Sequence, residues 1–67
     1  MGTRVIKTRR ELERVLESFP YERTLFHSHS VWNKLEALYL LELMGFAFSR
    51  KLLCELLREW GEAACRE

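Results

Sequence analysis

The fold is decided by residues 30–50, which read SVWNKLEALYLLELMGFAFSR. Ser30 is a good helix N-cap, because its hydroxyl can accept a hydrogen bond from a free N–H of the first turn. Gly45 stands where helices commonly end, at the position that favours a left-handed backbone. The stretch therefore predicts a helix over residues 31–44, then a turn, and then a further helix that Ser49 caps.

The predicted helix over residues 31–44 has apolar residues on more than one side. At 100° per residue one face is apolar, and we expect it to be the core face: Val31, Trp32, Leu35, Leu38 and Tyr39. In its second half apolar residues occur all round: Leu40, Leu41, Leu43 and Met44. A helix that is hydrophobic all round must be buried on all sides. We therefore expect the segment over residues 20–30 or a second chain to cover what the neighbouring helices leave open.

Two more helices flank this one in the sequence. Thr8 and Glu11 form a capping box, and apolar residues follow at helical spacing until Pro20, which predicts a helix over residues 9–19. A third helix is predicted over residues 50–64, with one apolar face: Leu52, Leu53, Leu56, Leu57, Trp60 and Ala64. We expect Trp60, at the centre of that face, to close the core.

The remaining segments are extended or irregular. Residues 1–7 predict an extended basic arm whose β-branched residues favour a short strand. Residues 23–27 are either a second strand, paired with residues 4–7, or part of a loop that crosses the helices. The predicted fold class is mainly α: a compact three-helix domain over residues 1–67 with a short extended N-terminal arm or strand.

Composition excludes several classes of function. The chain has no Asp, no glycine-rich phosphate loop and no nucleophile elbow, and it is too short to enclose a pocket. We therefore expect no enzymatic activity, no cofactor and no small-molecule substrate. No apolar run is long enough to cross a membrane, which favours an intracellular protein.

The two cysteines predict a reducing compartment. Cys54 and Cys65 are eleven positions apart, and on one continuous helix that spacing is about 16 Å, too far for a disulfide. Two unpaired thiols are typical of the cytoplasm.

Two further features of the sequence have alternative interpretations. His27 and His29 would point the same way on a strand and could share a metal ion, or they are surface or capping residues. Glu42 falls in line with the apolar side of its helix, where a carboxylate must pair with an arginine or lie at the edge of the core.

The leading hypothesis for function is a small helical protein-interaction module that self-associates or docks onto a larger protein. The near-neutral net charge of +1 and the surplus of apolar residues around Gly45 support it. A phage-type or mobile-element regulator or inhibitor is one setting for such a module. The predicted interface residues are Leu40, Leu43, Met44, Phe46 and Phe48.

The alternative hypothesis is a DNA-binding regulator. Residues 37–60 have the outline of a helix-turn-helix, although the bend after Gly45 is longer than in the tightest motifs. Residues 1–14 carry a net charge of +3, which would attract phosphates. The predicted nucleic-acid contacts are Arg4, Lys7, Arg9, Arg10, Arg50, Lys51 and Arg58.

Overall fold

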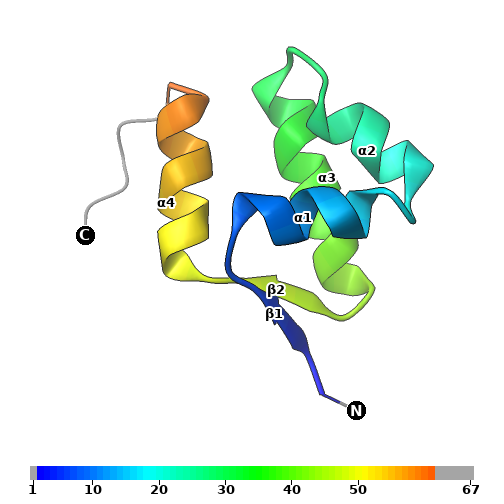
Figure 1. The fold of residues 1–67 in the computed structure, drawn as a ribbon. Helices are drawn as coiled ribbons and strands as arrows, with labels where there is room; N and C mark the ends of the chain where they lie inside the picture. The colour runs from blue at the N-terminus through cyan, green and yellow to red at the C-terminus, as the bar shows by residue number, and fades with distance from the viewer. Residues whose placement is uncertain (1, 62–67) are drawn as a thin grey trace.

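The computed structural model describes residues 2–61, and these contain four helices and two short strands (Figure 1). Their order is β1 (Arg4–Ile6), α1 (Arg9–Leu16), α2 (Pro20–Phe26), α3 (Val31–Leu43), β2 (Phe46–Phe48) and α4 (Arg50–Glu59). The mainly helical class is confirmed, with one helix more than the three predicted. None of the described helices has the length and hydropathy of a membrane-spanning segment.

The two strands pair in parallel and bring the N-terminus against the segment after α3. Val5 lies opposite Ala47, and Arg4 donates its N–H to the Gly45 carbonyl at 3.0 Å. Parallel strands need a long crossover connection, which here contains α1, α2 and α3. Figure 1 shows the sheet at one end of the helices, with α4 on one side and α2 and α3 on the other.

The predicted N-terminal strand is therefore present, but its predicted partner is wrong. Residues 23–27 do not form a strand, because residues 20–26 form α2. Pro20 is the first residue of α2, where its fixed φ suits a helix and its missing N–H costs nothing. The partner strand is instead β2, the segment that the sequence predicted as a turn. Its two aromatic residues favour a strand once a partner is available.

The helix starts follow the predicted caps. Thr8, Ser30 and Ser49 each accept a hydrogen bond from a first-turn N–H through their side-chain hydroxyl. The capping box differs in one respect, because the Glu11 carboxylate accepts its bond from the Lys7 N–H at 3.0 Å and thus reaches one residue further back.

The helix ends are less well predicted. Gly45 follows α3 with φ +103°, as its place in the sequence indicated. The first helix ends at Leu16, three residues before the predicted end, and a turn leads to Pro20. The last helix ends at Glu59 because Gly61, with φ +86°, provides a second left-handed position. Predicted helical residues 62–64 lie outside the described residues.

The core lies between the helices and the sheet. Its buried side chains are Ile6, Leu12, Val15, Leu16, Phe26, Ala37, Leu38, Leu41, Leu52 and Leu56. Trp60 packs against this cluster while remaining partly exposed, so it covers one side of the core and is not fully enclosed.

Cys54 is fully buried and disulfide-bonded, so the prediction of two unpaired thiols is wrong for this residue. The prediction assumed a continuous helix to residue 64, whereas α4 ends at Glu59. Cys65 lies outside the described residues. The prediction of a reducing compartment rested on two unpaired cysteines, and it therefore loses this support.

Candidate protein-interaction surface

The inner side of α3 attaches it to the core. Ala37, Leu38 and Leu41 are buried there, and Ala37 is fully enclosed. A small side chain at that position lets neighbouring elements approach the α3 backbone closely. Most of the contacts of α3 are made with α2 and β2.

The opposite side of α3 carries large apolar side chains in solvent. Trp32 is 81% exposed, Tyr39 56% and Leu43 65%. These three residues and the exposed Glu36 follow one another at steps of four, three and four residues, so they lie along one line of the helix. We call this line the outer α3 face: Trp32, Glu36, Tyr39 and Leu43.

The sequence-based prediction placed Trp32 and Tyr39 on the core side of this helix, and that prediction is wrong. The helix is turned by about a third of a revolution from that prediction, so Ala37 and Leu41 face inward beside Leu38, which is buried as predicted. Glu36 was the signal for this orientation, since a carboxylate midway between two aromatic residues marks that line as solvated. Glu42 is also exposed, and not part of the core side.

The predicted interface residues divide into two groups. Leu43 lies on the outer α3 face, and Met44 is 42% exposed at the end of the helix, whereas Leu40 is half-buried beside that face. Phe46 and Phe48 belong to β2 and pack against the core as half-buried residues. The structure thus brings Leu40, Leu43 and Met44 near one surface, while Phe46 and Phe48 help to hold the sheet on the helices.

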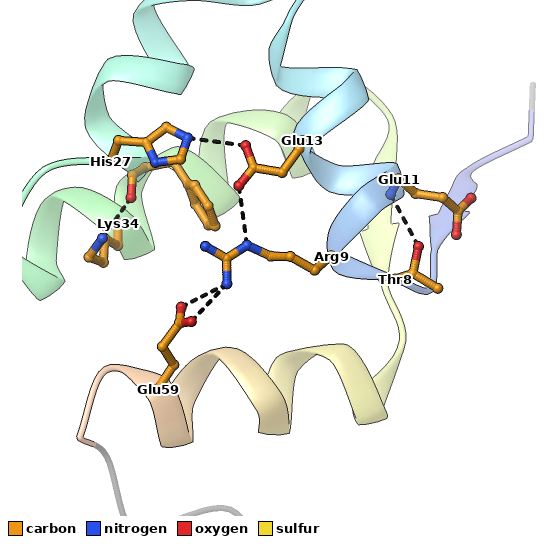
Figure 2. A network of polar contacts seen from close by, with 8 residues as sticks. Thr8, Arg9, Glu11, Glu13, His27, Lys34 and Glu59 are labelled. Atoms are coloured by element: carbon orange, nitrogen blue, oxygen red, sulfur yellow. Dashed lines mark hydrogen bonds and ion pairs between the residues drawn. The ribbon is translucent and has the colours of Figure 1, made fainter.

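A network of charged side chains joins α1, α2 and α4 at the edge of the core (Figure 2). Arg9 donates from Nη1 to both carboxylate oxygens of Glu59, at 2.8 and 3.0 Å, and from Nε to Glu13 at 3.2 Å. The other oxygen of Glu13 lies 3.1 Å from Nε2 of His27. Arg9, a predicted nucleic-acid contact, is thereby engaged within the chain.

The Phe26 ring lies at the centre of this network. The Arg9 guanidinium is 5.3 Å from its centroid, and Nζ of Lys34 is 5.7 Å from the same ring. Lys34 also donates to the Phe26 carbonyl at 2.8 Å, which satisfies an orphan acceptor at the end of α2, and it lies 5.6 Å from the Trp60 ring. The ammonium group of Lys34 is thus hydrogen-bonded and lies near two aromatic rings, which explains why a lysine is tolerated on the inner side of α3.

The other basic residues proposed for nucleic acid are on the surface but scattered. Arg4, Lys7 and Arg10 are exposed on β1, the connection and α1. Of these three only Arg4 lines an open depression of about 650 Å³, together with Arg14, Glu11, Phe19 and Phe46. Its charges have both signs, which gives no uniform basic field.

Residues 37–60 do not form the predicted helix-turn-helix. A strand, β2, separates α3 from α4 and pairs with β1, so the connection is part of a sheet and not a short turn. The predicted contacts on α4 are exposed beside the acidic residues Glu55 and Glu59: Arg50, Lys51 and Arg58.

The geometry proposed for a shared metal at His27 and His29 is absent. The two residues follow α2 in a turn, whereas the proposal needed a strand. His27 instead contacts Glu13. Within residues 2–61 no three potential ligands gather in the way a metal site requires.

Comparison of the chain with protein-family models, with curated proteins and with solved structures finds no match. What the protein does must therefore be inferred from its own surface.

Proposed function

We propose that this protein is a small, non-enzymatic protein-interaction module that binds protein through the outer α3 face. The observation that supports the proposal most strongly is the exposure of Trp32, Tyr39 and Leu43 along one line of a helix whose other side is buried. Tryptophan and tyrosine are the residues most enriched among those that contribute binding energy at protein interfaces.

The surface has the composition of an interface centre with a polar rim. Leu35 and Leu40 flank the outer α3 face as half-buried residues, which widens its apolar area. Glu42 and Asn33 lie further round the helix and would provide polar groups at the margin. A helix that presents anchors at such spacing is a common recognition element for other helices and for grooves.

Photo-crosslinking tests this proposal directly. A benzophenone side chain in place of Tyr39 is expected to form covalent adducts with protein in extracts of the cells that produce this chain. The matched control is the same replacement at Tyr21, which is 62% exposed on α2 and should give none. Absence of adducts from position 39, or equal adducts from both positions, would contradict the proposal.

A DNA-binding regulator is the alternative function, and the exposed basic residues Arg4, Lys7 and Arg10 support it. Arg9 supports it less, because Glu13 and Glu59 already neutralise its charge. Duplex affinity that falls steeply with added salt, and that falls again in an Arg4→Ala/Lys7→Ala variant, would favour this alternative. No shift of any duplex at low salt would exclude it.

A further inference from the structure

The spacing of the residues on the outer α3 face is the same when counted from either end of the helix. Its four residues are spaced four, three and four positions apart, so the pattern is symmetric about a point midway between Ala37 and Leu38. The average step is about 3.7 residues, close to the 3.6 residues of one helical turn, so the four side chains stay on one side along which a second helix can pack. Trp32 and Leu43 occupy the two ends of the pattern, and Glu36 and Tyr39 occupy the two inner positions.

This symmetry lets all four residues meet one another when the helix pairs with an identical helix running in the opposite direction. A two-fold axis through this midpoint places the two ends of the pattern opposite each other, so Trp32 of one copy meets Leu43 of the other. The same axis places Glu36 of one copy opposite Tyr39 of the other. We infer that the partner of the outer α3 face is a second copy of this chain, with the two α3 helices antiparallel. The inference rests on the proposed function and names its partner.

The single charge on the face distinguishes the two possible directions. In an antiparallel pair the Glu36 carboxylate faces the hydroxyl of Tyr39 in the other copy, which can donate a hydrogen bond to it. In a parallel pair in register, Glu36 of one copy would face Glu36 of the other copy, and the two carboxylates would be desolvated together. The antiparallel arrangement gives each of the two Glu36 carboxylates a hydrogen-bond donor, whereas the parallel arrangement gives them none.

The size of the surface indicates a weak and reversible dimer. The thirteen residues of α3 extend over about 20 Å, so the contact is small compared with that of a permanent dimer. The half-buried Leu35 and Leu40 on either side of the line add apolar area to it. We therefore expect monomer and dimer to exchange between micromolar and millimolar concentration.

Sedimentation equilibrium on the whole chain tests both the partner and the direction. The wild-type protein should dimerise as its concentration rises. Tyr39→Glu should abolish the dimer, because the new carboxylate of each copy then faces Glu36 of the other copy. The double variant Glu36→Lys/Tyr39→Glu should restore it, since an antiparallel pair then contains two opposite-charge pairs. In a parallel pair the same double variant would place like charges together at both positions.

Each outcome has a distinct meaning. Tyr21→Glu is the matched control and should dimerise as the wild type does, and circular dichroism should show all variants folded, because positions 36 and 39 are exposed. If Tyr39→Glu does not fold, Trp32→Ala takes its place and should shift the association to higher concentration. A dimer lost in the double variant as well, or a wild-type monomer at every concentration, would overturn the inference. In the second case adducts from position 39 with a different protein would still leave the proposed function standing.

Discussion

Replacing Phe26 by leucine should destabilise the protein far more than its modest change in size indicates. The ring is 1% exposed, lies edge-to-face with Trp60 at 5.8 Å between centroids, and has cations on Arg9 and Lys34 near it. A small large-to-small exchange in a core, such as Ile→Val, costs about 0.5–1.5 kcal/mol. The aromatic pair adds about 0.5–1.5 kcal/mol, and each cation adds about 0.5–1 kcal/mol at partly exposed positions such as these.

We therefore expect Phe26→Leu to lower the free energy of unfolding by about 2–5 kcal/mol. The core of a domain of this size supplies only about 3–5 kcal/mol, so the variant should lose most of that contribution. Urea denaturation followed by circular dichroism measures the change, provided that the slope with denaturant stays constant.

Phe48→Leu is the matched control for this prediction. Phe48 packs against the same core from β2 without the two cations that Phe26 has, so its replacement should cost less than about 1.5 kcal/mol. Equal losses for the two variants would refute the reasoning, because they would show that the cations and the Trp60 ring contribute nothing beyond apolar burial.

Three further predictions concern the elements around the core. Gly45→Ala should cost about 1–2 kcal/mol through the backbone alone, since φ is +103° and a Cβ would meet no atom; an unchanged urea midpoint would contradict the left-handed C′ position. Ile6→Ala should cost about 2–5 kcal/mol, because the side chain is fully buried, and a loss below about 1 kcal/mol would show that β1 is not part of the folded unit. Glu59→Gln should cost less than about 1 kcal/mol at low salt and nothing at high salt, because the pair with Arg9 is half-exposed; a loss that persists in salt would indicate a structural role for the ion pair.

Local signals predicted the starts of three helices correctly. Each of Thr8, Ser30 and Ser49 is an N-cap whose hydrogen bond involves residues three positions apart, so the sequence contains all that is needed to find it. The ends were harder to place. Gly61 is a stop signal for the last helix, but Ala64 continues the apolar periodicity and so favoured a longer helix.

The sheet could not be predicted because its two strands are far apart in the sequence. Phe46–Phe48 has three residues, and its pairing with Arg4–Ile6 depends on the crossover that α1 to α3 provide. Periodicity reports only local structure, so neither the partner nor the parallel direction follows from it. The same limit explains α2, whose seven residues are too few to show a helical repeat clearly.

The candidate surface was predicted in kind but not in its residues. The sequence showed that the helix over residues 31–44 has more apolar surface than its neighbours can cover, and Leu43 and Met44 are indeed exposed. Helical periodicity places Trp32 and Tyr39 on one apolar face with Val31, Leu35 and Leu38, and that face was predicted to be the core side. Which of two apolar sides faces inward depends on how the other elements pack, and here the side with Ala37, Leu38 and Leu41 is buried.

The central claim is that the outer α3 face is covered by protein in the functional complex. The environment of the Trp32 side chain tests this claim directly. With fluorinated tryptophan the chain gives two fluorine resonances, one from Trp32 and one from Trp60, which Trp32→Phe assigns. We predict that the Trp32 resonance shifts toward the value of a buried indole as the protein is concentrated or added to extract of its own cells, while Trp60 stays unchanged. A Trp32 resonance that keeps the position of a solvated indole under every one of these conditions would contradict the account.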